Sequence, residues 1–363
     1  MAQFEIDDSI MYDIGASLAA ESIEKHKDTY GAVMDSAIHQ LCSKQDVVYT
    51  NKIETAEYTE WNLAVFDGHG ITRGRNPYSG KYEKYNFAVL ALQDMIETKQ
   101  MDDILSREIF GEEDSALALQ RAFSKLCIDK QTSMIDTGAT MVHVKVRRVF
   151  LTKKILVDVL SVGDSVAVIH KNGEKVFQTI EHTPFNEDEI ARLKCEKRIT
   201  DDSITPGNSF EMLDADTICH KGGRYVDVQG VMMAMTQSVG HIRYSSYDLV
   251  KEERGIFGLA PYKAHLEFSE TDKLNIKLFS DGVSDVVTET VECDRLFMIQ
   301  STATETADFA KSRWEKEWKV TNKPEWEDSV RTGEPFKFRR GKIGADDVAC
   351  VSLILGPIED GVA

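Results

Sequence analysis

The residues of this chain best suited to chemistry are carboxylates that lie next to strongly apolar segments. Residues 63–66 have the composition of a buried strand and are followed directly by Asp67, Gly68, His69 and Gly70. A carboxylate at a strand end is held rigidly, and a glycine beside it lets the main-chain carbonyl approach a ligand. Taken alone, Asp-Gly after a strand is more typical of a hairpin turn. The motif by itself therefore leaves a turn and a ligand site open.

The same arrangement recurs along the chain. Asp164 follows the apolar residues 155–162, and the run 274–279 is followed by Asp281 and then Asp285, whereas Asp346 and Asp347 precede the run 348–355. If antiparallel strands bring these ends to one edge of a sheet, the carboxylates repel one another unless protons or cations neutralise them. Carboxylates, a main-chain carbonyl and water suit Mg²⁺ or Mn²⁺, and the absence of a Cys or His cluster disfavours Zn²⁺. Two such ions side by side would form a hydrolytic centre in which a bound water attacks phosphorus.

The order of these motifs resembles that of the metal-dependent protein serine/threonine phosphatases of the 2C (PPM) type. The motifs concerned are Phe66-Asp67-Gly68-His69-Gly70, Thr137-Gly138-Ala139-Thr140, Val162-Gly163-Asp164-Ser165, His182-Thr183-Pro184 with Glu189, Ser280-Asp281-Gly282 with Asp285, and Asp346-Asp347. Together they cover nearly the whole chain, and both halves contribute to one site. We therefore expect a single catalytic domain over residues 1–363.

The resemblance implies an α+β fold of two packed antiparallel β-sheets flanked by helices, with a binuclear Mn²⁺ or Mg²⁺ centre at one edge. Asp67 would bridge both ions, and Gly68 would offer its carbonyl to one of them. His69 would be the general acid that protonates the leaving serine or threonine oxygen; the alternative is a turn histidine bonded to the backbone. The remaining metal ligands would be Asp281 and Asp346 at the first ion, Asp35 near the second, and Asp164 and Asp285 at a weaker third ion.

Two segments depart from the family pattern. The first family motif has a phosphate-binding arginine a few residues before a Glu-Asp pair, in which the Glu binds the second ion and the Asp orients its water. We place Met34-Asp35 at this pair and Tyr30 at the arginine. A thioether cannot replace a hard oxygen ligand, so the second ion should bind more weakly. The family's Arg-x-x-Gly-Asp is represented here by Gln237-Ser238-Val239-Gly240-His241.

Two functions remain open on these residues. The first is metal-dependent hydrolysis of phosphoserine and phosphothreonine in proteins by metal-activated water, with a phosphoprotein as substrate. The second is a pseudophosphatase, a binding or regulatory protein with weak or no catalysis because Tyr30 and Met34 replace the Arg and Glu. We favour the enzyme because Asp67, the bridging position, is retained. Arg73 and Arg75 are alternative phosphate contacts, although exposed loops commonly carry arginine.

The composition excludes several other classes of function. A net charge of −18 and a pI near 5.0 argue against a nucleic-acid partner, which would require Lys and Arg stripes. No apolar run approaches the ~20 residues of a membrane span, and the N-terminus lacks a signal-peptide core. Six cysteines without C-x-x-C spacing indicate reduced thiols, as in a cytoplasmic or nuclear protein.

The intervening segments should position the acidic strand ends. Residues 47–66 alternate as a hairpin would, and the apolar stripes within 87–95 and 119–127 indicate helices packed on a sheet. The segment 321–342, with Trp326 and Arg339, looks like an insertion that is either a docking surface for a protein partner or a packed surface loop. The other expectations are an N-terminal helical extension over 1–28, a loop-rich flap over 200–228, and one long helix over 294–318.

Overall fold

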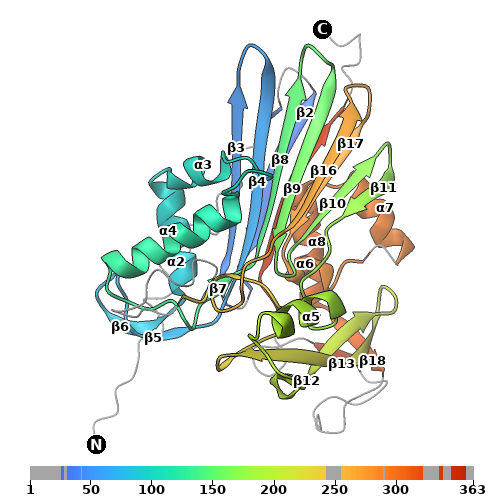
Figure 1. Ribbon diagram of the computed structural model, residues 1–363. Helices are drawn as coiled ribbons and strands as arrows, with labels where there is room; N and C mark the ends of the chain where they lie inside the picture. Colours follow the sequence, from blue (N-terminus) through green and yellow to red (C-terminus); the bar gives the residue numbers. More distant parts are fainter. Residues whose placement is uncertain are drawn as a thin grey trace, which may run out of the picture.

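Two antiparallel β-sheets packed face to face, with helices on both outer faces, form the body of the molecule (Figure 1). The computed structural model describes residues 26–27, 31–41, 43–242, 255–288, 291–321, 335–337 and 345–356. This arrangement confirms the predicted α+β sandwich. The helical extension predicted for residues 1–28 lies outside the described residues apart from residues 26–27, which form a strand.

The first sheet has the strand order β1-β2-β20-β17-β10-β11, and all its pairs are antiparallel. Its strands are β1 (His26–Lys27), β2 (Ala32–His39), β10 (Val166–Lys171), β11 (Glu174–Gln178), β17 (Leu274–Phe279) and β20 (Val348–Leu355). Strand β20 lies between β2 and β17, so strands far apart in the sequence are neighbours in this sheet.

The second sheet has the order β15-β7-β4-β8-β9-β16, with β3 also paired to β4. Its strands are β3 (Asp46–Glu54), β4 (Tyr58–His69), β7 (Gly138–Ala139), β8 (Met141–Val149), β9 (Lys154–Val162), β15 (Val239–Gly240) and β16 (Tyr262–Ser269). The hairpin predicted around residues 47–66 is β3–β4. A separate small hairpin joins β5 (Thr72–Arg75) and β6 (Tyr82–Tyr85).

Alternation along β4 explains why the two sheets and the helices pack as they do. Trp61, Leu63 and Val65 face the first sheet and join a core with its apolar side chains, whereas Ala64 and Phe66 face the helices on the other side. Successive strand residues point to opposite faces, so an unbroken apolar run is buried on both. The acidic end of β4 is thus anchored by two cores.

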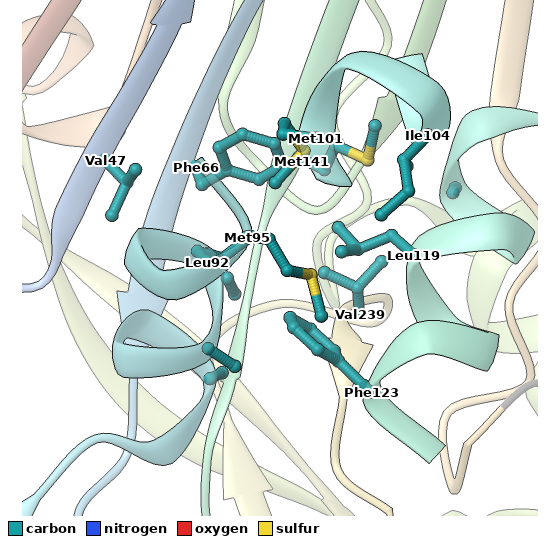
Figure 2. Close-up of a cluster of buried hydrophobic side chains, with 14 of the residues drawn as sticks. Val47, Phe66, Leu92, Met95, Met101, Ile104, Leu119, Phe123, Met141 and Val239 are labelled. Atoms are coloured by element: carbon teal, nitrogen blue, oxygen red, sulfur yellow. The ribbon is translucent and has the colours of Figure 1, made fainter. Parts of the chain in front are cut away.

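Three helices cover the outer face of the second sheet (Figure 1). Figure 2 shows Leu92 and Met95 meeting Leu119, Phe123 and side chains of the sheet in one apolar cluster. The helices are α2 (Phe87–Glu97), α3 (Gln100–Leu105) and α4 (Ser115–Asp129). Both apolar stripes predicted from the sequence therefore form helices that pack on this sheet.

The outer face of the first sheet is covered by α6 (Asp281–Ser284), α7 (Glu292–Gln300) and α8 (Ala303–Glu315). The prediction of one long helix over 294–318 is therefore wrong. Thr302 begins a second helix with a capping box, because its hydroxyl accepts from Glu305 N and the Glu305 carboxylate accepts from Thr302 N. The buried Lys277 Nζ donates to Met298 O at 2.5 Å and Ser301 Oγ at 2.6 Å, which closes the preceding helix.

The segment 200–228 is mostly strand, so the prediction of a loop-rich flap is wrong. Figure 1 shows the hairpin of β12 (Ile204–Met212) and β13 (Thr217–Val228) at one end of the molecule, near α5 (Glu187–Cys195). Cross-strand packing supports this hairpin where the periodicity of a single strand is weak. It is completed by β14 (Val231–Met233), β18 (Glu317–Thr321) and β19 (Pro335–Lys337), and a 3₁₀ turn (Asp201–Ser203) precedes it.

The described residues of the predicted insertion over 321–342 belong to the sheet formed by β12, β13, β14, β18 and β19. Thr321 ends β18, which runs parallel to β13, and β19 pairs with β18. Trp326, Arg339 and the rest of the segment lie outside the described residues, as does Tyr30. Among the residues described, no helix is both long and apolar enough to cross a bilayer.

A chain of buried polar groups joins α4 to the second sheet. His143 Nδ1 lies 2.9 Å from Ser115 Oγ, and its Nε2 lies 3.3 Å from Asn62 Oδ1. Burial, with a smaller effect of Lys145, lowers the pKa of His143 to about 3. The folded protein therefore keeps His143 neutral at pH values where the unfolded chain protonates it.

We expect His143→Gln to flatten the loss of stability in acid. In the wild type the unfolded state takes up a proton below about pH 6.5 and the folded state does so only near pH 3, so His143 lowers the free energy of unfolding by up to about 1.4 kcal/mol per pH unit. Urea unfolding at pH 7.5, 5.5 and 4.5 measures the difference, with His265→Gln at an exposed histidine as control. Equal acid slopes for His143→Gln and the wild type would contradict this account.

Candidate metal centre

The strand ends that carry carboxylates meet at one end of the sandwich. In the first sheet Phe279 is opposite both Val166 and Cys350, so Asp164, Asp281 and Asp346 emerge at the same edge. In the second sheet, Asp67 at the end of β4 is opposite Asp46 at the start of β3. Ser280 Oγ, next to Asp281, donates to Asp46 Oδ2 at 2.8 Å, and this hydrogen bond joins the two groups. The structure thus brings together the predicted residues Asp67, Asp164, Asp281 and Asp346.

Mutual repulsion between the carboxylates of this cluster raises their pKa values. Burial first, and neighbouring carboxylates second, raise the pKa of Asp46, Asp67 and Asp164 well above the usual range. The same causes, with Asp281 the main neighbour, raise the pKa of Asp346 to about 8. Each of these groups is stabilised by a bound proton or by a bound cation.

The donor atoms fit a hard divalent cation. Oδ1 of Asp46, of Asp164 and of Asp281 is buried and has no hydrogen-bond partner among the described residues. Unpaired buried carboxylate oxygens are costly unless a cation meets them. In the described residues no three His, Cys, Asp or Glu side chains stand in the arrangement of a finished metal site.

Asp285 and Glu181 lie at the exposed rim of the cluster. Asp285 follows α6 and is electrostatically coupled to Asp281 and Asp346, as well as to Glu181. Glu181 is not among the site residues predicted from the sequence. Its position directly before His182-Thr183-Pro184, a motif already assigned to the site, was the available signal.

Asp35 is not part of this cluster, and its predicted place among the metal ligands is corrected. It lies opposite Ser352 in the β2–β20 pair, five residues past Asp347, or roughly 16 Å along the strand. Its carboxylate accepts from Thr304 N at 3.0 Å and from Thr304 Oγ1 at 3.1 Å, at the start of α8. A carboxylate at a helix N-terminus satisfies free N–H groups and complements the helix dipole. Met34, beside it, packs against the core between the sheets.

Gln45 and Asp46, and not Met34 and Asp35, lie beside Asp67 and Gly68. Gln45 N donates to Asp347 Oδ2 at 2.9 Å, and the main-chain carbonyl of Gln45 accepts from Gly68 N at 3.1 Å. Gln45 Nε2 donates to Gly70 O at 3.2 Å. The other side-chain atom, the amide oxygen Oε1, is the one that could bind a cation. An amide oxygen is a neutral but hard ligand, whereas the thioether of Met34 is soft. Residues 40–44 contain Lys44 and no arginine.

We expect Gln45→Glu to raise the affinity for Mn²⁺ about tenfold, because a charged oxygen replaces a neutral one in a site whose affinity depends on ligand charge. Isothermal titration of Mn²⁺ into both proteins measures the change. Gln178→Glu, on an exposed strand position, adds the same charge away from the cluster and controls for net charge. An unchanged affinity in Gln45→Glu would argue against Gln45 as a residue of the metal centre.

Two glycines allow the close approaches that shape the site. Gly70 has φ +81°, and a Cβ there would lie 2.0 Å from Asp136 O. Gly282 lies between Asp281 and Asp285, and a Cβ there would lie 1.9 Å from Asp347 O. The Gly282 carbonyl accepts from Trp314 Nε1 at 2.6 Å, which fixes α6 to α8. Only a residue without a side chain fits at either position.

His69 is held by groups from the loop around β15. Its Nε2 lies 2.9 Å from His241 Nε2 and 3.0 Å from Ser238 Oγ. Burial, followed by the neighbouring His241, lowers the pKa of His69 well below its ordinary value. Nδ1 is buried and has no hydrogen-bond partner among the described residues, and the nearby main chain of Asp67 partly offsets the lowering of the His69 pKa. Among the described residues, Nδ1 is the ring nitrogen left for another group.

Glu189, grouped with His182-Thr183-Pro184 among the sequence motifs, lies outside the carboxylate cluster. Gln237 Nε2 donates to its Oε2 at 2.9 Å, and Arg192 pairs with the same oxygen at 3.0 Å. Arg192 therefore supplies the positive charge that position 237 lacks. Glu189 connects α5 to the segment that carries His241.

Comparisons with known proteins show the family of this chain. The family model described as Protein phosphatase 2C matches residues 38–313. Protein phosphatase 1K, mitochondrial, of Xenopus laevis is 24% identical over 235 residues, 64% of this chain and 51% of that protein. The chain thus spans about half the length of the curated relative it matches.

Solved structures similar to this chain include two phosphatases. One is a phosphatase from a pathogenic strain of Toxoplasma gondii, with a TM-score of 0.47, 14% identity, and coverage of 90% of this chain and 93% of that one. The other is the catalytic domain of the serine threonine protein phosphatase PstP in complex with 2 manganese ions, with a TM-score of 0.42, 16% identity, and coverage of 89% and 98%.

Proposed function

The chain belongs to the protein phosphatase 2C family, since the family model matches more than half of it, and we propose that it hydrolyses phosphoserine and phosphothreonine in proteins with the help of Mn²⁺ or Mg²⁺. The observation that carries the proposal is the meeting of Asp46, Asp67, Asp164 and Asp281 at one end of both sheets, three of them with unpaired buried oxygens. Such a cluster is stable at neutral pH only when protons or cations neutralise its charge, and hard divalent cations suit its oxygens.

The residues that would hold the cations come from both sheets. Asp67 and the Gly68 carbonyl would serve the paired ions with Asp281 and Asp346, while Asp164 and Asp285 would serve a weaker third ion, with Glu181 beside them. Bound cations supply an acidified water and stabilise charge on the phosphoryl group. Asp46 accepts from Ser280 Oγ at 2.8 Å through one oxygen and keeps the other free, which suits a group that orients water.

His69 would act as the general acid. The leaving serine or threonine oxygen is a poor leaving group unless a proton reaches it as the P–O bond breaks. With Nε2 occupied by His241 and Ser238, His69 would deliver that proton from Nδ1. His69 follows the cluster residue Asp67 by two positions, so the acid and the carboxylates share one rigid strand end.

A pseudophosphatase is the second candidate, and two residues favour it. Gln45 and His241 replace family carboxylates with neutral groups, and no arginine precedes Gln45 in residues 40–44. The enzyme remains the better supported proposal, because Met34 no longer stands at a ligand position and Gln45 offers a hard oxygen in its place.

Phosphate release from a phosphothreonine peptide separates the two functions. We expect turnover that requires added Mn²⁺ or Mg²⁺, is abolished by EDTA and is lost in Asp281→Asn. A pseudophosphatase would bind the peptide, as measured by fluorescence anisotropy, and would release no phosphate above the Asp281→Asn level. That second result would overturn the proposed enzyme.

A further inference from the structure

His241 is held so that only one of its ring nitrogens is available to His69. Its Nδ1 lies 2.7 Å from the main-chain carbonyl of Ile135. A carbonyl oxygen only accepts, so Nδ1 carries the hydrogen, and Nε2 of the neutral ring is left as an acceptor. Burial lowers the pKa of His241 to about 4, which keeps this ring neutral.

The same reasoning sets the tautomer of His69. Two imidazole nitrogens 2.9 Å apart need one hydrogen between them, and His241 Nε2 has none, so His69 Nε2 must carry it. Ser238 Oγ lies 2.9 Å from Val239 O and 3.2 Å from Ala139 O, where its hydrogen is used, so its oxygen also faces His69 as an acceptor. Nδ1 of His69 is therefore left for exchange of a proton with a substrate.

The position of His241 is built into the fold. Its ring stacks on His69 with centroids 5.0 Å apart and meets Phe257 edge-on at 5.2 Å. Its φ of +48° is unusual for a residue with a Cβ. Gly138 leaves the space for the ring, because a Cβ at that position would lie 2.5 Å from His241 Cδ2. Strained backbone that the surroundings enforce is often found at functional sites.

We propose that His241 is a positioning residue that fixes His69 with the hydrogen on Nε2, so that Nδ1 serves the leaving oxygen of alkyl phosphate esters. This inference rests on the proposed function. It adds that alkyl phosphate esters, whose leaving oxygen needs a proton, depend on His241. As the P–O bond breaks, its electron pair passes to the serine or threonine oxygen, and a proton on His69 Nδ1 passes to that oxygen while Nε2–H stays bound to His241. The attacking water loses a proton to solvent, and solvent restores the proton on Nδ1.

Two substrates that differ in leaving group test this role. A phosphothreonine peptide needs the proton, whereas para-nitrophenolate leaves without it. We expect His241→Phe, which keeps the stacking and removes the acceptor, to lower the peptide-to-para-nitrophenyl phosphate activity ratio at least about tenfold. His241→Gln retains an acceptor and should restore most of that ratio. Equal losses on both substrates, or equal ratios for Phe and Gln, would overturn the proposal.

A matched control loosens the same loop without touching His69. Gln120 holds Gly240 through two hydrogen bonds, Gly240 N to Oε1 at 2.7 Å and Nε2 to Gly240 O at 3.0 Å. Gln120→Met should change both activities by the same factor, because its effect is only structural. A change in the ratio equal to that of His241→Phe would overturn the positioning role.

The tautomer is also measurable without catalysis. In ¹⁵N-labelled protein, long-range ¹H–¹⁵N spectra should show His69 protonated at Nε2 in the wild type and in His241→Gln, and a mixture in His241→Phe. A neutral His69 ring with its hydrogen on Nδ1 in the wild type would overturn the proposal. If the wild type hydrolysed neither substrate, the proposed phosphatase activity would be wrong. These spectra would still show whether His241 fixes the tautomer of His69.

Discussion

Asp67→Asn should lower Mn²⁺-dependent hydrolysis of a phosphothreonine peptide about a thousandfold or more. The carboxylate lies where both sheets contribute to the cluster, coupled to Asp281 and to Asp46. An amide cannot supply the second negative oxygen that a shared ligand needs, and metal stabilisation is worth several kcal/mol in such reactions. Initial rates at saturating Mn²⁺ measure the loss.

The same variant should be more stable than the wild type without metal. Folding raises the pKa of Asp67, so its ionised form costs stability as the pH rises above the ordinary carboxylate range. At pH 8 the metal-free variant should therefore melt at a higher temperature than the metal-free wild type, and Mn²⁺ should raise its melting temperature less. Differential scanning fluorimetry with and without EDTA gives both values.

Asp35→Asn is the matched control for this experiment. Asp35 is also a buried aspartate, but its carboxylate serves Thr304 at the start of α8. We expect this variant to lose about 1 kcal/mol of stability and to keep its dependence on Mn²⁺. If Asp35→Asn abolished turnover and Asp67→Asn did not, the assignment of the metal centre would be wrong.

Gly282→Ala should lower both stability and turnover. The added Cβ would lie 1.9 Å from Asp347 O, and this neighbour is backbone, so α6 must move away from residues 346–347. Overpacking of this kind costs about 1–3 kcal/mol, and a shift of about 1 Å between catalytic groups can cost on the order of a hundredfold in rate. Urea unfolding and initial rates on the phosphothreonine peptide measure the two effects.

Gly74→Ala provides the comparison, since a Cβ at Gly74 meets nothing within 4 Å. That variant should keep the stability and turnover of the wild type. Similar behaviour of the two alanine variants would mean that the contact between α6 and Asp347 does not hold the site together.

The acidic strand ends could be predicted from the sequence because the signal is local. A run that is apolar at every position, such as the one before Asp67, is buried on both faces, and the next polar residue must lie at the sheet edge. Recurrence at Asp164, Asp281 and Asp346 then indicated a common edge. The sandwich itself followed from the resemblance that these residues carry.

The first motif could not be placed in the same way, because its partners are distant in sequence. Asp35 and Asp46 both begin or lie in short apolar segments, and only strand pairing distinguishes them. Counting outward along the β3–β4 hairpin from the Glu54–Thr59 pair brings Asp46 opposite Asp67, so this register was the missed signal. The role of Asp35 depends on the N-terminus of α8 at Thr302, and the prediction of one continuous helix over 294–318 did not include a helix start there.

A crystal soaked in Mn²⁺ and measured at the manganese absorption edge tests the central assignment most directly. The account predicts anomalous peaks beside Asp67 and Asp281, with the free oxygens of Asp46 and Asp164 turned toward that site, and no peak at Asp35. If no anomalous peak appeared at Asp67 while manganese ions occupied other sites of the chain fully, the assigned metal centre and the phosphatase mechanism that depends on it would be contradicted.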